Sequence, residues 1–542
     1  MRPMSITGIA CSLTALLSLS GAVQAGHDGA DVLAPLPADR FTQADARHLL
    51  LRAGFGGSIE EVQRLHRLGL DGMVSWLVDY EGRPDVVGGL VLEPGERIDR
   101  NKLRRMEEAE RRRVRQRMRR ADALLFQHVR RWWMDRMLTT RRPLEEKMTL
   151  FWHGHFTTSY RDVRRSHLML QQNELLRFHA TGNFGELLHQ ISTDPAMLRY
   201  LNNNQNRKGR PNENFAREVM ELFSLGVGNY DETDIKQAAR AFTGWTLKNG
   251  QFTFNRRQHD TGRKTIFGKS GNFGGHDVCD MLLQHAACAP HVAGKIFAWF
   301  AYDDVEPELR EELGRVLASH RYELKPLLRR IFKSEAFYSK KAKGSKIKSP
   351  VELLVSTVRM LGMNPPPAEL LLFGAQRLGQ TVMSPPNVKG WEGGLAWITT
   401  ANLLERDNLC GLMLRAGQLV ARGNQPDAMR EGSARRKGGQ QRGNSRRRVS
   451  EAQLARWDSG LSACAMAQVT GASDATSLVD ALCGRLLVVG LRAKTRAQLV
   501  AFVTGADGSR RLDLKKLRGR AAEAKLRKLL HLIMSTPEYQ VC

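Results

Sequence analysis

The sequence predicts a mainly α protein: a multi-helix orthogonal array with a few short hairpin strands and a small C-terminal helical lobe. Two observations carry this prediction. Apolar residues recur at helical spacing along most of the chain, and the alternating pattern of half-buried strands is nearly absent. The chain has 542 residues, of which 42% are hydrophobic and 26% charged, so most of it is expected to fold, into two or three lobes.

The predicted helices begin at Thr42, a suitable cap, and the first of them ends at the glycines that follow Ala53. Ile59, Val62 and Leu65 then give the next segment a helical apolar stripe. Further helices are expected at 122–140, 144–152, 184–192, 213–225, 231–242, 279–300, 307–319, 323–333, 350–361, 400–420 and 522–534. The stretch "WTLKNGQFTFN" predicts a hairpin, since Asn249-Gly250 suits a tight turn.

The N-terminus is typical of a secretory signal peptide covering residues 1–25. An early arginine, Arg2, precedes an apolar run at about 9–19, and small residues precede the expected cleavage after Ala25. The run is too short for a permanent membrane span, and no later segment reaches eighteen apolar residues. We therefore expect an exported protein, periplasmic or extracellular, with no transmembrane span after cleavage.

Six cysteines follow the predicted leader, and in an oxidising compartment they permit about fifteen different pairings. Disulfide bridges and buried free thiols both remain open. The absence of a CxxC pair argues against a zinc ribbon or a thioredoxin-like motif.

The net charge of +27 is concentrated in two segments rather than spread over one face. Residues 97–120 carry twelve basic and four acidic side chains, and we read them as a charged arm of solvated helix. Residues 430–448 carry eight basic side chains and one acidic. They lie in a segment at 421–450, rich in Gly, Gln, Arg and Ser, that is expected to be disordered. This segment divides a main helical domain at 40–420 from a C-terminal lobe at 451–542.

Four polar motifs interrupt the apolar helical context. The first is "LFWHGHFTTS", and the second is "RPNENFAREVMELFSLGVGNY". The third is "NRRQHDTGRKTIFG", and the fourth is "SPPNVKGWEGGLAW". In the second motif, Arg217 has the i±4 spacing that allows it to bridge Glu213 and Glu221. The predicted ligand-binding residues in these motifs are Asn212, Asn214, Arg217, Lys264 and Trp391.

We expect the acidic and imidazole groups of these motifs to line a single pocket. The predicted acid–base residues are Glu218, Glu221, His259 and Asp260. The predicted ligands of a divalent metal ion, the one cofactor that these residues suggest, are His153, His155, Glu221 and His259. The structural alternative is a buried ion-pair network that orders the helices. No G-x-S-x-G, HExxH, P-loop, GxGxxG or CxxCH motif is present, which argues against the common hydrolases, nucleotide enzymes and cytochromes.

Taken together with "LEEKMTLFWHGHFTTS", "DPAMLRYLNNNQNRKGRPNENF" and "LLHLIMSTPEYQ", these motifs resemble the bacterial domain of unknown function 1800 family over about residues 40–540. The arginine-rich segments and Gly154, where relatives commonly carry asparagine, depart from the family pattern. The resemblance implies an exported, mostly helical protein. It also implies a frequent partner from the domain of unknown function 1501 family, which is similar to the alkaline phosphatase and sulfatase superfamily. It implies no reaction.

Three functions remain open on the sequence. The leading one is a cell-envelope binding or assembly factor that works with a hydrolase-like partner and whose basic segments contact an anionic polysaccharide or lipid surface. The alternative is a metal-dependent or acid–base hydrolase of an envelope or extracellular polymer. The third is a binder of anionic polymers or nucleic acid, and export argues against nucleic acid as the ligand.

Overall fold

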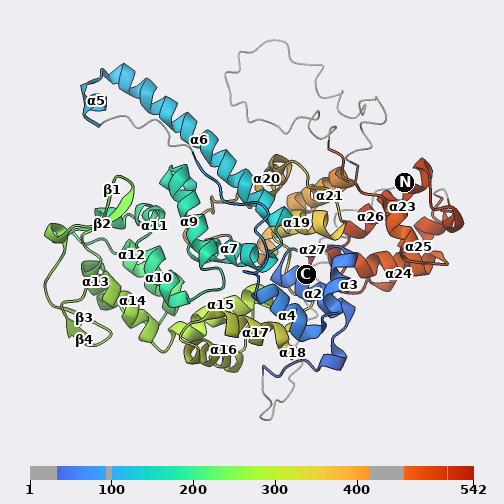
Figure 1. Ribbon diagram of the computed structural model, residues 1–542, viewed down its shortest axis with the longest axis horizontal. Helices are drawn as coiled ribbons and strands as arrows, with labels where there is room; N and C mark the ends of the chain where they lie inside the picture. The colour runs from blue at the N-terminus through green and yellow to red at the C-terminus, as the bar shows by residue number, and fades with distance from the viewer. Residues whose placement is uncertain (1–32, 93–99, 416–456, 509–510) are drawn as a thin grey trace.

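The computed structural model describes residues 33–92, 100–415, 457–508 and 511–542 (Figure 1). Helices make up most of these residues, whose strands form just two antiparallel sheets of two strands each. The prediction of a mainly α protein with a few short hairpin strands is confirmed. The predicted signal peptide and the low-complexity segment at 421–450 lie outside the described residues.

The first N-terminal helix begins after Thr42, as the sequence predicts, and the following segment forms two helices rather than one. The three helices are α2 (Gln43–Ala53), α3 (Ile59–His66) and α4 (Gly69–Val78). The Thr42 side chain accepts a hydrogen bond from the Asp45 backbone N–H, and the Asp45 carboxylate accepts one from the Thr42 backbone N–H in a capping box. The apolar stripe through Val62 and Leu65 is buried.

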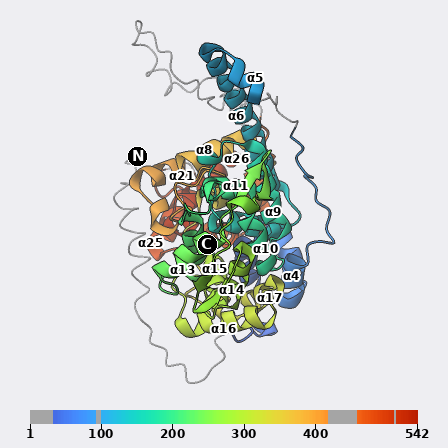
Figure 2. The ribbon, with the colours of Figure 1, turned by 90° about the vertical axis from the view of Figure 1, so that its left-hand side faces the viewer.

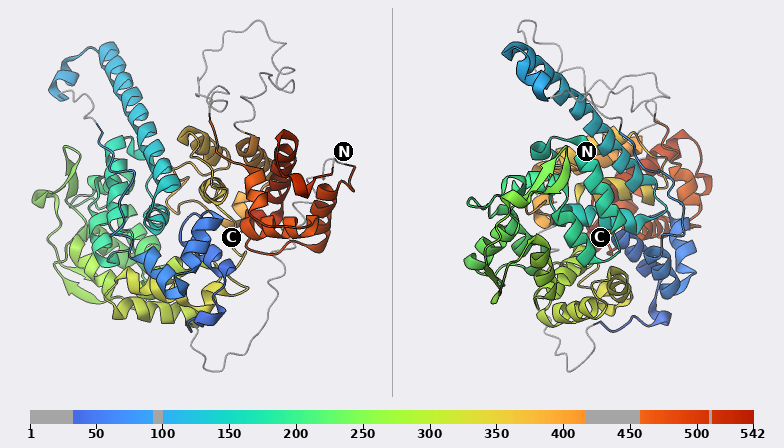
Figure 3. Two further views of the ribbon diagram at one scale, coloured as in Figure 1. Left: turned by 45° about the vertical axis from the view of Figure 1, so that its right-hand side comes forward. Right: turned by 60° about the vertical axis from the view of Figure 1, so that its left-hand side comes forward.

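The charged arm is helical in its described part, formed by α5 (Arg100–Arg105) and the first turns of α6 (Glu108–Thr139). In Figures 1, 2 and 3 this part rises away from the body of the molecule. The 32 residues of α6 correspond to a length of about 48 Å. Only its second half is apolar: from Phe126 to Leu138 it packs against neighbouring helices and is largely buried.

Five helices follow α6: α7 (Pro143–His155), α8 (Tyr160–Val163), α9 (Ser166–Phe178), α10 (Phe184–Ser192) and α11 (Pro195–Tyr200). Every residue of α7 except Gly154 is buried, because this helix contributes side chains to both hydrophobic cores of the molecule. The polar residues of α7 must therefore find buried partners. This requirement shapes the polar clusters described below.

The segment predicted as one helix at 213–225 divides into two. An α-helix, α12 (Asn214–Glu218), continues as a π-helix, η3 (Val219–Leu225), before α13 (Glu232–Ala241). The π-helix ends at Gly226, whose φ of +79° favours glycine.

The predicted hairpin is present as β1 (Trp245–Lys248) and β2 (Gln251–Phe254), with Trp245 opposite Phe254. Asn249 and Gly250 have φ of +55° and +83°, as a type I′ turn requires. A second, smaller hairpin follows, formed by β3 (Lys264–Ile266) and β4 (Lys269–Gly271).

The remaining α-helices are α14 (Gly275–Gln284), α15 (Cys288–Phe300), α16 (Pro307–Ser319), α17 (Leu324–Lys333), α18 (Glu335–Tyr338), α19 (Pro350–Met360), α20 (Ala368–Arg377), α21 (Thr400–Arg415), α23 (Ala463–Gln468), α24 (Ala475–Leu486), α25 (Ala493–Thr504), α26 (Arg520–Met534) and α27 (Pro537–Gln540). Short 3₁₀ turns are η1 (Ala38–Arg40), η2 (Asn203–Gln205), η4 (Arg256–Gln258), η5 (Gly394–Trp397) and η7 (Leu514–Lys516).

The apolar side chains form two large cores. The first is built by α2–α4, α7, α10 and α13–α17. The second is built by the apolar half of α6 together with α19–α21 and the C-terminal helices α23–α26. The C-terminal helices thus share a core with the preceding part of the chain. The six cysteines within the described residues are buried free thiols.

Candidate functional site

His155 supports the backbone of the π-helix. Its Nε2 lies 3.0 Å from the carbonyl oxygen of Phe223, and Lys295 of α15 donates to the neighbouring carbonyl of Leu222 at 3.2 Å. Carbonyls at the end of a helix lack partners within the helix, so these two side chains supply them. Burial, together with the nearby Lys295 charge, holds the pKa of His155 well below its ordinary value, so the ring is neutral.

His153 lies on another face of α7 and contacts aromatic rings. Its ring meets Trp133 edge-on, with centroids 5.4 Å apart, and lies 5.8 Å from the ring of Trp391. Burial lowers the pKa of His153 to about 4. A Cβ on Gly390 would lie 2.8 Å from the Gly154 carbonyl oxygen, so glycine is required for this approach. The structure thus brings the first and fourth motifs together, through packing.

Glu218 and Glu221 lie beside each other at the junction of α12 and η3, where both are half-buried. Glu221 accepts a hydrogen bond of 2.8 Å from the Tyr230 hydroxyl. Burial, and then the charge of Glu221, raise the pKa of Glu218, while the charges of Arg217 and then Lys389 oppose this shift. The two predicted carboxylates therefore do lie together. Their neighbours include Tyr230 and the exposed Lys389.

Arg217 does not bridge Glu213 and Glu221 as its spacing suggested. It lies 3.4 Å from Glu213 but makes its closer ion pair, at 2.7 Å, with Glu232 at the start of α13. The tertiary contact with α13 supplies this better partner. Two neighbouring asparagines order the loop before α12: the Asn212 N–H donates to the Asn206 side chain, and the Asn214 N–H to the Asn212 side chain.

The third motif forms its own cluster of contacts. Arg240 donates to Asp260 through Nε at 2.8 Å and Nη2 at 3.2 Å, and these bonds lower the pKa of Asp260 to about 2. Nδ1 of His259 lies 2.9 Å from the Thr243 carbonyl oxygen. Lys264 donates to the Asp260 carbonyl at 2.6 Å. These contacts hold the loop between β2 and β3 in place.

The predicted metal ligands are engaged in other contacts. In the part of the chain that the structure describes, no three His, Cys, Asp or Glu side chains are grouped so that they could hold a metal ion. The reason is local: a ring nitrogen of His155 and one of His259 each face a backbone carbonyl, and Glu221 accepts from Tyr230. Of the predicted acid–base residues, Asp260 is likewise paired, with Arg240.

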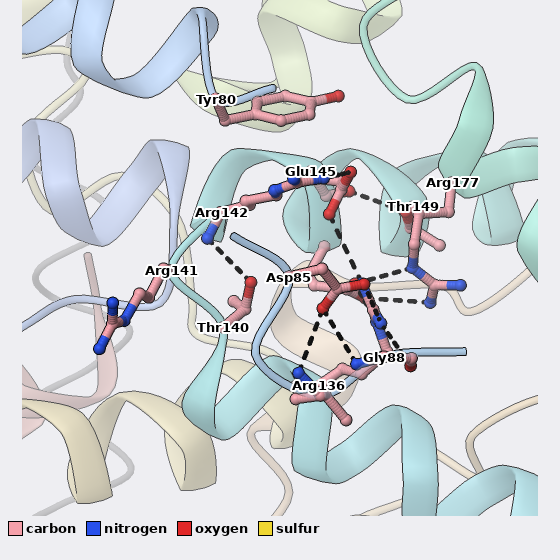
Figure 4. Close-up of polar contacts among 12 residues, drawn as sticks. Tyr80, Asp85, Gly88, Arg136, Thr140, Arg141, Arg142, Glu145, Thr149 and Arg177 are labelled. Carbon is pink, nitrogen blue, oxygen red and sulfur yellow. Dashed lines mark hydrogen bonds and ion pairs between the residues drawn. The ribbon is translucent and has the colours of Figure 1, made fainter. Parts of the chain in front are cut away.

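A buried ion-pair network that sequence reasoning missed lies at the first turn of α7. Glu146 is fully buried and accepts hydrogen bonds from Arg136 at 2.6 Å, Arg177 at 2.7 Å and the Trp133 indole at 3.0 Å. Burial alone would raise the pKa of Glu146, but the two arginines outweigh it and hold the pKa below its ordinary value. Arg136 also reaches Asp85 at 2.8 Å. Figure 4 shows Asp85, Arg136 and Arg177 of this network, with Glu145 nearby.

Glu145 occupies a different environment from its neighbour in the chain. Its nearest cations are Arg142 at 3.5 Å and Arg136 at 3.6 Å, and its Oε2 has no hydrogen-bond partner among the described residues. Burial, and then repulsion from Glu146, raise its pKa to about 7. Adjacent carboxyl groups with separated pKa values are a feature of functional sites and of buried networks alike. The sequence signal was Glu145-Glu146-Lys147 inside an otherwise apolar helix.

A pocket of about 560 Å³ lies next to the network, because Arg177 also pairs with Glu174 on its wall at 2.6 Å. The lining is rich in amide and aromatic groups: Gln171, Phe178, Gln190, Gln251 and Phe252. Asp194 also lines it, is only 3% exposed, and caps α11 by accepting from the Met197 N–H at 2.9 Å. Burial raises the pKa of Asp194 to about 7. Asp194 is therefore a further acid–base candidate, beside those that the sequence suggested.

Comparison with known proteins gives one match. A family model described as a protein of unknown function (DUF1800) matches residues 48–541, nearly the whole chain. No curated protein and no solved structure matches the chain. Among the helices that the structure describes, none combines the length and apolarity needed to cross a membrane.

Proposed function

The chain belongs to the DUF1800 family, and from that premise we propose that it is an exported binding protein that holds an anionic polymer of the cell envelope. The binding element is the arm formed by α5 and the first turns of α6. One observation carries the proposal: from Arg111 to Arg120 the arm carries seven arginines and no acidic residue, on a helix that projects from the body.

The arm has the properties of an electrostatic contact surface. Six of those seven arginines are exposed, namely Arg112, Arg113, Arg115, Arg117, Arg119 and Arg120. Isolated surface ion pairs such as Arg112–Glu108 contribute little stability. A dense row of like charges on a solvated helix is unfavourable for folding, so a ligand that neutralises it is the physical reason we infer for its presence.

The test measures binding of a soluble anionic polysaccharide, heparin, to the full chain as salt is raised. We expect the affinity to fall steeply with salt, as it does when a polyanion releases its bound counterions. Replacing Arg112, Arg113, Arg115 and Arg117 by glutamine should weaken binding at least tenfold and flatten the salt dependence. The matched control removes four exposed arginines elsewhere: Arg161, Arg207, Arg256 and Arg257.

Equal loss in the two fourfold variants would contradict the proposal, because net charge rather than the arm would then decide binding. Double-stranded DNA serves as a comparator of matched charge. A clear preference for DNA over the polysaccharide would favour the nucleic-acid alternative.

A second candidate function, acid–base hydrolysis of a hydroxyl-rich polymer, is supported by the pocket beside Asp194. A carboxyl group with a pKa near 7 can donate a proton at neutral pH, and amide and aromatic side chains suit sugar rings. Glu174, paired with Arg177, would be the ionised partner in this reaction.

Asp194→Asn tests this candidate because asparagine retains the helix cap and removes the acid. We expect reducing ends released from envelope polysaccharide to fall at least a hundredfold. Asp231→Asn is the matched control, since Asp231 also caps a helix, α13, and lies outside the pocket. Equal release by the wild type and the Asp194 variant would rule the candidate out.

A further inference from the structure

An arginine-lined pocket of about 570 Å³ lies where α3, α4, the end of α6 and the end of α19 meet. Four guanidinium groups line it, those of Arg64, Arg83, Arg141 and Arg359. Glu61 is the one carboxylate among its described lining residues, so the charged lining carries four positive charges and one negative. None of the arm residues takes part.

Two of the arginines are fixed in the wall. Arg359 donates to the carbonyls of Gly56 at 2.9 Å and Leu138 at 3.1 Å, and lies 3.7 Å from Glu61. Its guanidinium also caps the carboxyl end of α6, where the helix dipole is negative. Its bonds to backbone hold it in place without neutralising its charge, and Glu61 offsets that charge only in part.

Arg83 is held as firmly but is left with an unmet donor. Its Nε donates to the Arg141 carbonyl at 2.8 Å, and its guanidinium lies over the Trp76 ring at 4.4 Å. Nη2 is buried and has no hydrogen-bond partner among the described residues. Burial, and then the charge of Arg142, lower the pKa of Arg83. A buried donor without an acceptor is costly, so a bound anion would relieve it.

The other two arginines stand at the rim. Arg64 lies 5.6 Å over the same Trp76 ring, and Arg141 is exposed and points away from the buried ion-pair network (Figure 4). Arginines therefore line the pocket from four separate segments of the chain. Of the nearby carboxylates outside the lining, Asp79 pairs with Arg329 and Glu81 with Lys325.

We propose that this pocket binds the phosphate group of a phosphate ester. A carboxylate offers two oxygens in one plane, whereas a phosphate offers three or more to donors that approach from different directions. A volume of about 570 Å³ exceeds what an inorganic anion fills, so it leaves room for the ester group. A doubly charged ligand also offsets most of the excess positive charge of the lining.

Titration of the full chain with inorganic phosphate, at constant ionic strength maintained with sodium chloride, tests the proposal. We expect saturable binding by calorimetry that is tighter at pH 8, where phosphate is a dianion, than at pH 5.5. The double variant Arg64→Gln and Arg141→Gln should weaken binding at least tenfold. Both side chains are exposed, so the variant is expected to fold.

Two controls make the result specific. The double variant Arg161→Gln and Arg256→Gln removes the same charge at exposed positions outside the pocket, and should bind phosphate like the wild type. The fourfold arm variant should also bind phosphate normally, so failure of the arm proposal and failure of this one are distinguishable. Absence of saturable binding, unchanged affinity in the pocket variant, or tighter binding of citrate than of phosphate would each overturn the proposal.

Discussion

The two halves of α6 use the same residue type in opposite ways. In the first half, Arg112 is 77% exposed and pairs with Glu108 one turn away. In the second half, Arg136 is 2% exposed and contacts Asp85, Glu145 and Glu146. The difference shows that the surroundings of an arginine decide its role in this chain. On the arm it is a solvated charge, and in the body it forms ion pairs that connect helices.

The largest expected effect comes from removing the carboxylate at the centre of the buried network. Glu146→Gln removes the buried carboxylate that Arg136 and Arg177 share and leaves them only Asp85, Glu145 and Glu174 as acidic partners, so we expect it to lower the free energy of unfolding by about 3–5 kcal/mol. The matched change in the first half of α6, Glu108→Gln, should cost about 0.5 kcal/mol or less. Urea denaturation measures both, and similar losses would erase the contrast between the two halves.

Glu145 should make the stability of the buried half fall as pH rises from about 4.5 to about 7. Folding raises its pKa from 4.5 to about 7, so its contribution to stability is fully present below pH 4.5 and is lost as pH rises through 7. Relative to wild type, Glu145→Gln should therefore become more stable by about 2 kcal/mol between pH 5 and pH 8. Glu110→Gln, on the exposed arm, should show no such trend in the same unfolding measurements.

His153 should act in the opposite direction, because folding lowers its pKa from 6.5 to about 4. The unfolded state binds the extra proton, so stability is fully present above pH 6.5 and is lost as pH falls towards 4. His153→Phe should reduce the loss of stability between pH 7 and pH 5 by about 2 kcal/mol. The comparison is His128→Phe, an exposed position on α6, where an equal change would argue against burial as the cause.

The smallest effect is expected on the arm itself. Replacing Arg112, Arg113, Arg115 and Arg117 by glutamine should alter the free energy of unfolding by about 0.5 kcal/mol or less, because these side chains are exposed. Thermal and urea unfolding both check this. A cooperative loss of several kcal/mol would mean that the arm is part of the folded core, and would undermine any binding result obtained with that variant.

Local rules predicted the elements that depend on neighbouring residues. Thr42 begins α2 and Asn249-Gly250 closes the hairpin, because each depends on chemistry within a few residues of the chain. The continuation of α12 as a π-helix was not predictable in this way. Its end is supported by Lys295 and His155, which are distant in sequence.

The sequence by itself determined a mainly helical chain of the DUF1800 family, its capped helices, and a basic helical arm, because periodicity, capping and charge density are local properties. Only the tertiary structure decided which polar residues meet. Glu146 forms ion pairs with Arg136 and Arg177. His155 instead contacts a backbone carbonyl, and Asp260 pairs with Arg240. A buried charge takes the partner that the packing of helices brings within about 3 Å, and that packing is set by the whole core.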